Sequence, residues 1–210
     1  TGSPGSFHLT LAGLRRLRKT GVRVHTNTTI SQPNLPHLED LVRLIHSLGL
    51  ERFSMNLVIP SGAAAAQRDL WVSYLDIGAA VRRVKAVAAE CGVEFMWYSP
   101  TPLCAFNPIA EGLGPKSCAA CDGLLSVSPS GGVLPCSSFD ESVGSLLHAS
   151  FAEVWNSERA RFYRRKDYAH DLCRSCADFE ACCGACPLYW NALGHGELVA
   201  LREECHAAPA

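Results

Sequence analysis

The sequence predicts an α/β fold followed by a small cysteine-rich region, and two observations lead to this prediction. Residues 7–98 alternate between helical and strand-like patterns. This alternation is typical of parallel strands joined by crossover helices that lie on one side of the sheet. Of the 11 cysteines, none lies in the first 90 residues and nine lie between Cys104 and Cys186. We therefore predict two domains, residues 1–100 and residues 101–210.

The first region is expected to contain three helices and three strands. Leucine and other apolar residues recur at helical spacing in three segments, each closed by a glycine, at residues 7–20, 34–48 and 76–90. Segments rich in β-branched or apolar residues are expected to form strands at 22–30, 53–59 and 93–98. Three parallel strands make a sheet with an open edge.

Beyond residue 100 the sequence has less periodicity. Residues 100–117 carry four prolines and are expected to form a linker. A hairpin is expected where residues 124–128 and 133–136 flank a turn at Gly131, which suits a positive φ. Short helices are expected at residues 151–166 and 188–193.

The cysteines form two arrays with metal-ligand spacing. The first is Cys118-x2-Cys121-x9-Gly131-x4-Cys136. The second is Cys173-x2-Cys176-x5-Cys182-x3-Cys186, and Cys205 follows it. Thiolate is a soft ligand, and four thiolates are the usual set for a zinc site or a 4Fe–4S cluster. The eight cysteines of the two arrays make two sets of four, so we expect two metal centres and a reducing, cytoplasmic location.

Composition argues against two classes of partner. The formal net charge is −1, so the chain lacks the basic excess typical of nucleic-acid binders. No apolar run approaches the length of about 18 residues that crosses a membrane. We therefore expect neither a nucleic acid nor a membrane as partner.

The spacing of the two arrays, from residue 118 to residue 205, resembles the SPASM domain, the C-terminal extension of many radical S-adenosylmethionine (SAM) enzymes. The phrases Val133-Leu134-Pro135-Cys136 and Cys183-Gly184-Ala185-Cys186 also resemble that domain. Residues 7–98 are similar to the second half of the radical SAM barrel. The resemblance implies the C-terminal half of a partial (βα)6 barrel, without its N-terminal strands, followed by a SPASM-like domain with a β-hairpin and short helices.

The resemblance also implies an interleaved set of ligands for two auxiliary 4Fe–4S clusters. Cluster one would be held by Cys118, Cys121, Cys136 and Cys186. Cluster two would be held by Cys173, Cys176, Cys182 and Cys205. Cys104 is either an additional candidate ligand or a buried small hydrophobe, and Cys183 is expected to be structural.

By the same resemblance, the full-length protein would be an oxidoreductase or maturase that uses SAM and a third 4Fe–4S cluster. A 5′-deoxyadenosyl radical would modify a peptide or, as the second choice, a small cofactor precursor. The auxiliary clusters would transfer electrons to or from a reductase or acceptor, or position the substrate. Asn27 and Asn56 would contact SAM, unless they are capped or face solvent. No catalytic residue is assigned.

One departure from the family limits what this chain does alone. Radical SAM chemistry needs a C-x3-C-x2-C motif, and Cys182-x3-Cys186 is followed at the required place by Tyr189. The chain is therefore not expected to be active alone. Two other functions remain open: a zinc-stabilised binding module with four thiolates per site, and a stand-alone electron-transfer domain.

Overall fold

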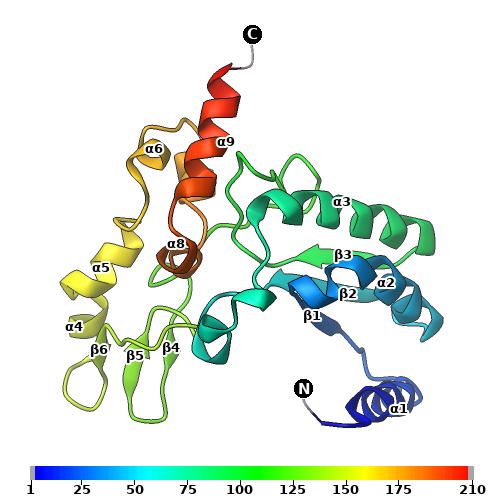
Figure 1. Ribbon diagram of the computed structural model, residues 1–210. Coiled ribbons are helices and arrows are strands. Elements are labelled where there is room, and N and C mark those ends of the chain that lie inside the picture. Colours follow the sequence, from blue (N-terminus) through cyan, green and yellow to red (C-terminus); the bar gives the residue numbers. More distant parts are fainter. Residues whose placement is uncertain (1–2, 208–210) are drawn as a thin grey trace.

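The computed structural model describes the chain from residue 3 to residue 207, with side chains described to residue 203. In this part of the chain the elements form two three-stranded sheets with helices around them (Figure 1). The first sheet and its helices form one half of the molecule, and the cysteine-rich segments form the other. The α/β fold expected from the sequence is confirmed.

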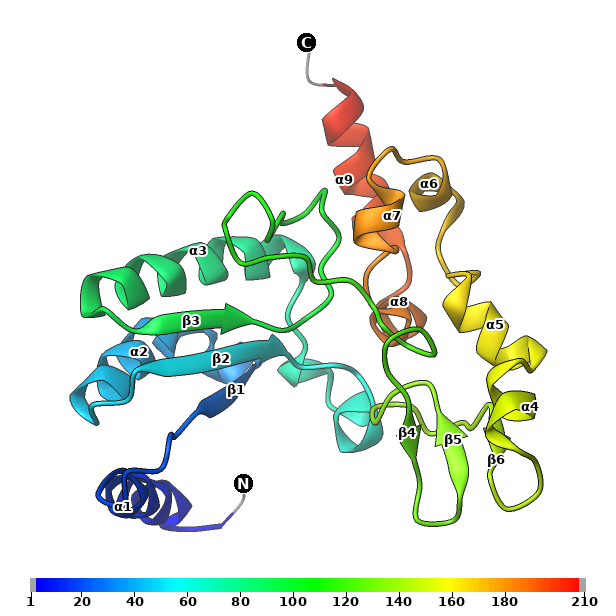
Figure 2. The ribbon, with the colours of Figure 1, turned by 180° about the vertical axis from the view of Figure 1, so that it is seen from behind.

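The first sheet is parallel, in the order β1 (Thr26–Ile30), β2 (Arg52–Leu57), β3 (Glu94–Trp97). The connecting helices α2 (Leu38–Ser47) and α3 (Tyr74–Cys91) lie side by side on one face of it (Figures 1 and 2). Their apolar side chains share one buried core with alternate residues of β2. The predicted parallel strands with crossover helices on one side are therefore confirmed.

Local sequence signals set the ends of α3. The Ser73 side chain accepts a hydrogen bond from the Asp76 backbone N–H and caps the first turn. The helix therefore begins two residues before the predicted start at residue 76. It ends at Gly92, whose φ of 66° is a left-handed conformation that glycine adopts at little cost.

Helix α1 (Ser6–Arg18) has no fully buried residue, and only its half-buried Leu11 and Leu14 pack against the main core (Figure 1). Its last residue is anchored, because Arg18 Nη1 donates a 2.8 Å hydrogen bond to the Leu48 carbonyl. Strand β1 begins at Thr26, four residues later than predicted. Thr26 pairs with Phe53, the second residue of β2, so residues 22–25 extend beyond the start of β2 and have almost no partner in it.

Short 3₁₀ helices fill two connections that carry no strand. The first, η1 (Gln32–His37), leads into α2. Two others, η2 (Gly62–Ala66) and η3 (Arg68–Leu70), occupy the segment between β2 and α3. The indole N–H of Trp71 donates to the Ala64 carbonyl and closes this segment on itself.

The second sheet is antiparallel and contains the predicted hairpin. Strands β4 (Ser126–Val127) and β5 (Gly132–Leu134) pair, and β6 (Gly144–Ser145), which the sequence analysis missed, pairs with β5. Gly131 has the expected positive φ, 79°. A Cβ at that position would lie 2.6 Å from Leu147 Cγ, but Leu147 is exposed and can move aside, so it is the positive φ that favours glycine here.

The predicted helix at 151–166 is wrong as a single element, because it is two helices, α4 (Phe151–Trp155) and α5 (Glu158–Arg164). Each has its own serine cap. Ser150 forms a capping box with Glu153, and the Ser157 side chain accepts from the Ala160 N–H. The second cap starts a new helix where the apolar pattern alone indicates continuity.

Four helices complete the described chain, and two of them pack against α3. They are α6 (Asp171–Arg174), α7 (Phe179–Cys182), α8 (Pro187–Leu193) and α9 (Gly196–Ala207). Helices α8 and α9 lie near the first turn of α3 (Figure 2). The rings of Tyr74 and Tyr189 are 3.9 Å apart between centroids. The main core therefore runs from the first sheet into the cysteine-rich half.

Candidate metal centre

The first group of cysteines gathers between the hairpin and the start of α8. Cys118, Cys121 and Cys186 are buried, and Cys136 is half-buried. Burial, with the charges of Cys118 and Cys136 acting in the same direction, raises the pKa of the Cys186 thiol to about 12. Burial also raises the pKa of Cys121, with the same two cysteines adding to the effect. The four thiols are therefore neighbours, although they come from two distant segments.

Backbone contacts fix the Cys118–Cys121 loop. Cys121 has a φ of 51°, uncommon for a residue with a side chain, and its N–H donates to the Leu124 carbonyl at 2.9 Å. Its own carbonyl accepts from Arg164 Nε at 3.1 Å. Helix α5 and the residues after it thus hold the loop that presents two of the four thiols.

The second group of cysteines lines a cavity of about 170 Å³. The described residues of its wall are Pro102, Leu103, Cys104, Leu172, Cys173, Cys176, Asp178, Phe179, Cys182, Leu198 and Arg202. Burial, with the charges of Cys182, Cys104 and Cys176 acting in the same direction, raises the pKa of Cys173 to about 11. Four thiols from α6, α7 and the linker therefore face one small space.

Two N–H groups point at sulfur atoms of this second group. The Leu103 backbone N–H donates to Cys182 Sγ at 3.5 Å. Arg202 Nη1, from α9, donates to Cys176 Sγ at 3.6 Å. Sequence analysis missed both donors, because neither belongs to the cysteine motif and each is far from its acceptor along the chain.

A left-handed turn separates the two groups. Cys183, Gly184 and Ala185 have consecutive φ values of 56°, 71° and 63°. The turn is held from outside, because Tyr168 Oη donates to the Cys183 carbonyl at 3.2 Å and Trp190 Nε1 donates to the Gly184 carbonyl at 2.7 Å. Cys182 and Cys186 flank the turn, which lets them join different groups. The Cys183 thiol donates to the Glu180 carbonyl, a structural contact.

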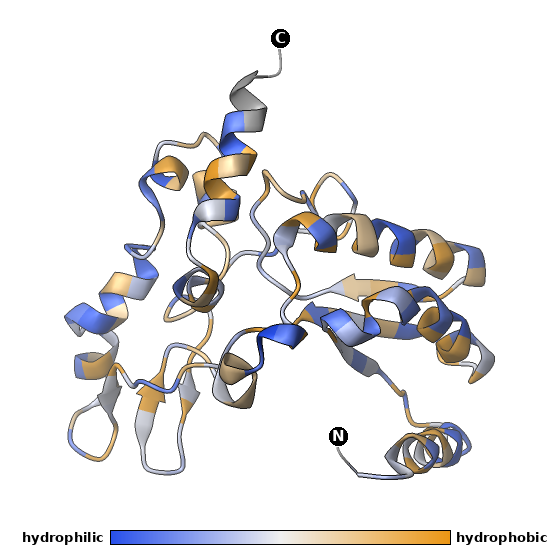
Figure 3. Ribbon diagram, viewed as in Figure 1, coloured by the Kyte–Doolittle hydropathy of each residue, from blue (hydrophilic) through white to orange (hydrophobic). Residues whose placement is uncertain are grey.

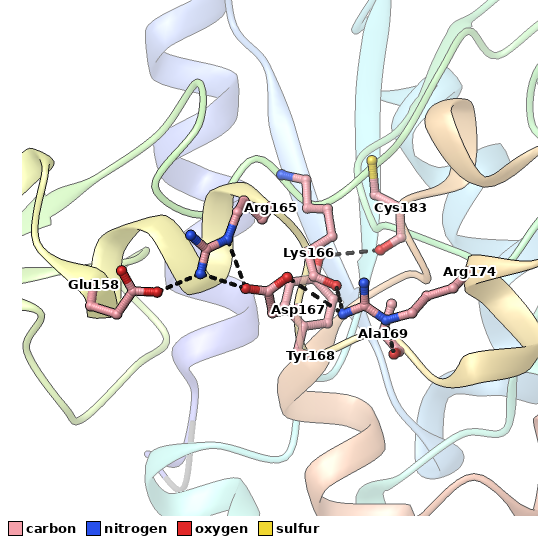
Figure 4. A network of polar contacts seen from close by, with 8 residues as sticks. All are labelled: Glu158, Arg165, Lys166, Asp167, Tyr168, Ala169, Arg174 and Cys183. Atoms are coloured by element: carbon pink, nitrogen blue, oxygen red, sulfur yellow. Dashed lines mark hydrogen bonds and ion pairs between the residues drawn. The ribbon is translucent and has the colours of Figure 1, made fainter.

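A network of charged side chains stiffens the segment between the two groups (Figure 4). Arg165 pairs with both Glu158 and Asp167, and Asp167 also pairs with Arg174. Arg174 in turn donates to the carbonyls of Lys166 and Ala169. The network thus links the end of α5 to α6 and so connects the first cysteine group to the second.

The structure brings together seven of the eight predicted ligands in two groups and adds Cys104 to the second. Cys205 is the eighth, and its side chain lies outside the described residues. Among the residues whose placement is described, no three histidine, cysteine or acidic side chains converge as ligands of one metal ion. Each group is thus a neighbourhood of thiols. Soft donors around a cavity, with N–H groups directed at sulfur, suit a thiolate-bound iron–sulfur group.

The predicted SAM-contacting asparagines also lie together, on the face of the first sheet opposite α2 and α3. Asn27 Nδ2 donates to Asn56 Oδ1 at 2.8 Å. Ser54 Oγ donates to Asn27 Oδ1 at 2.8 Å and lies 2.9 Å from His25 Nε2. Figure 3 shows β1 as largely hydrophilic, in contrast to the apolar residues of the core. This face therefore presents a row of polar groups.

Comparison with known proteins follows the division seen in the structure. Residues 118–177 match the family profile of SPASM, described as an iron–sulfur cluster-binding domain. These residues are therefore similar to a SPASM domain. As a whole the chain is similar to the C-terminal portion of radical SAM enzymes that have this domain, which confirms the resemblance noted in the sequence.

Two relatives that are similar in sequence to this chain are enzymes with named activities. An AdoMet-dependent heme synthase of Nitratidesulfovibrio vulgaris is 24% identical over 204 residues, covering 88% of this chain and 54% of the relative. A PqqA peptide cyclase of Gluconobacter oxydans is 24% identical, covering 88% of this chain and 52% of the relative. The chain thus spans about half the length of these relatives.

A solved structure shares the fold. SuiB of Streptococcus suis, in complex with the precursor peptide SuiA, superposes with a TM-score of 0.65 at 14% identity. The superposition covers 85% of this chain and 44% of SuiB. In the described part of the chain, no helix is long and apolar enough to cross a membrane.

Proposed function

We propose that this chain holds two auxiliary 4Fe–4S clusters within a radical SAM maturase. The observation that carries the proposal is the placement of soft thiols in two separate groups on either side of the left-handed turn at residues 183–185. We further propose that residues 1–100 form the C-terminal half of a partial barrel and residues 101–210 the auxiliary-cluster domain.

The proposed ligands follow the two groups. Cluster one takes the thiolates of Cys118, Cys121, Cys136 and Cys186. Cluster two takes those of Cys173, Cys176, Cys182 and Cys205, with Cys104 as a further thiol on the cavity wall. When bound, such clusters supply one-electron redox capacity at a potential that the surrounding protein tunes. The protein's part is to exclude water, hold the thiolates and direct N–H groups at their sulfurs.

Binding must release protons from the thiols. Burial raises the pKa of Cys173 and Cys186 to about 11 and about 12, so both are protonated at neutral pH before a metal arrives. A thiol deprotonates when it coordinates a cation, because the metal stabilises the thiolate. Assembly of the clusters is therefore coupled to folding of the segments that carry these cysteines.

The substrate and SAM are expected on the polar face of the first sheet. Asn27 and Asn56 offer amide donors and acceptors there, which suit the ribose or amino-acid part of SAM. A peptide is the favoured substrate, because PqqA peptide cyclase and SuiB with its precursor peptide are similar to this chain. The similarity to heme synthase keeps a small cofactor precursor as the second candidate. The auxiliary clusters would take electrons from a reductase or pass them to an acceptor, and a SAM-bound cluster elsewhere in the full-length protein would supply the radical.

Metal analysis of anaerobically purified chain tests the two-cluster proposal. Two 4Fe–4S clusters correspond to about eight iron and eight sulfide per chain. Cys136→Ser and Cys176→Ser should each lose about four irons, whereas Cys91→Ser, at the end of α3, should lose none. Colourless protein that contains zinc and no iron would establish the binding-module alternative instead.

SAM binding to the full-length protein tests the role of the asparagines. Asn56→Ala should weaken SAM binding about five- to tenfold, since one well-placed hydrogen bond contributes about 1 to 1.5 kcal/mol. Asn156→Ala, on the exposed surface of α4, is the matched control and should bind as the wild type does. Equal affinities for all three proteins would remove Asn56 from the SAM site.

A further inference from the structure

Arg202 is placed by α9 against the second cysteine group. Its Nη1 atom donates to Cys176 Sγ at 3.6 Å, and its side chain forms part of the wall of the four-thiol cavity. Among the described residues of that wall, Arg202 is the only cation and Asp178 is the only anion. Asp178 is exposed, whereas Arg202 is half-buried. Among the described residues of the wall, the charged group that hydrogen-bonds to a sulfur is therefore the positive one.

The guanidinium of Arg202 has no carboxylate partner among the described side chains. None of the ion pairs there involves it. Its Nε atom is buried without a hydrogen-bond acceptor in the described part of the structure. A buried, unsatisfied donor on a charged group is costly unless negative charge lies nearby. The negative charge that this cavity is built to receive is that of thiolates and the inorganic sulfur between them.

Charge and hydrogen bonds of this kind act on the energy of reduction. Reduction adds one electron from an external reductant such as dithionite and breaks no bond, so the cluster becomes more negative by one charge. A neighbouring cation stabilises the more negative state more, and N–H···S hydrogen bonds act in the same direction. Leu103 supplies one such bond from the backbone, and Arg202 supplies the other together with a full charge.

We propose that Arg202 is a positioning residue that raises the reduction potential of cluster two through its charge and its hydrogen bond to the sulfur of Cys176. The inference rests on the proposed function, because it requires cluster two to occupy the cavity. The inference also predicts a difference between the two clusters, because only the second has an arginine that hydrogen-bonds to a cysteine sulfur among the described residues. In the first group, Arg164 donates to the carbonyl of Cys121 and to that of Trp155, not to a cysteine sulfur.

The test is a redox titration of the anaerobically purified full-length protein, followed by electron paramagnetic resonance. The signal that disappears in Cys182→Ser is assigned to cluster two. In Arg202→Gln this signal should require a lower potential, by about a tenfold change in the reduction equilibrium, which is about 59 mV for one electron. The signal of cluster one should not move. Arg159→Gln is the control, because Arg159 pairs with exposed Glu141 and touches no cysteine sulfur.

If Arg202→Gln does not bind cluster two, the variant Arg202→Lys provides the test instead. Lysine retains the charge without the planar fork, so it should keep the cluster at a potential between those of arginine and glutamine. Unchanged potentials in Arg202→Gln, or loss of cluster two from both variants, would overturn the inference. Absence of cluster two from the wild-type protein would instead overturn the proposed function, so the two failures are distinguishable by the wild-type iron content.

Discussion

The ammonium group of Lys166 donates a 2.9 Å hydrogen bond to the backbone carbonyl of Cys118, across 48 positions of the chain. It also pairs with Asp122 at 3.1 Å, and the side chain of Lys166 is only 8% exposed. The cation therefore closes the Cys118–Cys121 loop from the side of α5. It fixes the backbone of that loop and makes no described bond to its thiols.

Replacing Lys166 by methionine should destabilise the first cysteine group. The change keeps the length of the side chain but leaves the Cys118 carbonyl without its buried donor. Leaving a buried acceptor unsatisfied costs about 1 to 3 kcal/mol. Urea denaturation of the anaerobically purified protein measures this loss, with Lys19→Met, an exposed lysine after α1, as the control. Equal unfolding free energies for Lys166→Met and Lys19→Met would show that the loop is held by other contacts.

The hairpin turn should tolerate no side chain at Gly131. Gly131→Ala combines a φ of 79° with a Cβ placed 2.6 Å from Leu147 Cγ. The left-handed backbone strain should cost about 1 to 3 kcal/mol, whereas the exposed Leu147 side chain can move aside at little cost. Gly123→Ala is the matched control in the same region, because its Cβ would make only an ordinary 3.8 Å contact with Ala119 Cβ. The unfolding temperatures of the two variants measure this difference. A Gly131→Ala protein as stable as Gly123→Ala would contradict the turn geometry.

The sequence predicted those features that depend on a local period or a fixed spacing. The helices and parallel strands before residue 98 follow from apolar patterns, and the glycine turn at Gly131 follows from its place between two strand-like segments. The break between α4 and α5 was missed because the apolar pattern runs through it. The hydrogen bond from the Ala160 N–H to the Ser157 side chain starts the second helix there. A single serine in the sequence is only a weak indication of such a cap.

The features that were not predicted depend on contacts between distant residues. Ala185 adopts a φ of 63°, which its residue type disfavours, because tertiary hydrogen bonds from Tyr168 and Trp190 hold the turn beside it. Arg202 reaches Cys176 only after α9 folds back over the second group. No spacing rule connects an arginine to a cysteine 26 positions earlier. The cysteine motif therefore predicts the ligands but not the groups that surround them.

The contacts that hold the linker carrying Cys104 should weaken when the pH falls below the range in which glutamate normally titrates. Arg82 and Lys85, on α3, hydrogen-bond Glu111 and lower the pKa of its carboxyl group below the usual value of 4.5. A lowered pKa means that the stabilisation is complete above the usual value and is lost as the pH falls through the lowered one. Glu111→Gln should therefore cost about 0.5 kcal/mol at pH 7 and almost nothing in strong acid.

Unfolding free energies of wild type and Glu111→Gln, measured across that pH range, check this dependence. Glu90→Gln is the control, since Glu90 and its partner Arg43 are both exposed and 3.9 Å apart. A Glu111→Gln difference that stays constant from neutral pH to strong acid would mean that the ion pairs do not fix the linker.

The contact between the two halves of the molecule should depend on the hydroxyl group of Tyr189. This hydroxyl accepts from the Tyr74 backbone N–H at 3.2 Å and donates to Glu197 Oε2 at 2.7 Å. The other oxygen of Glu197 accepts from the Leu75 N–H at 2.7 Å. Helix α3 thus has two of its free N-terminal N–H groups satisfied by α8 and α9, which a helix end needs when it is buried.

Tyr189→Phe removes the hydroxyl without changing the packing of the ring, so the Tyr74 N–H loses its acceptor. The expected cost is about 1 to 2 kcal/mol, and the Tyr74 amide should exchange with solvent hydrogen about tenfold faster. Tyr98→Phe is the control, because Tyr98 is 51% exposed and its hydroxyl contacts only Met96 Sδ in the described structure. If the Tyr74 amide exchanged at the same rate in both variants, the two halves would be joined by apolar packing alone. Faster exchange confined to Tyr189→Phe would make this hydroxyl a link between the first sheet's helices and the segment that carries the second cysteine group.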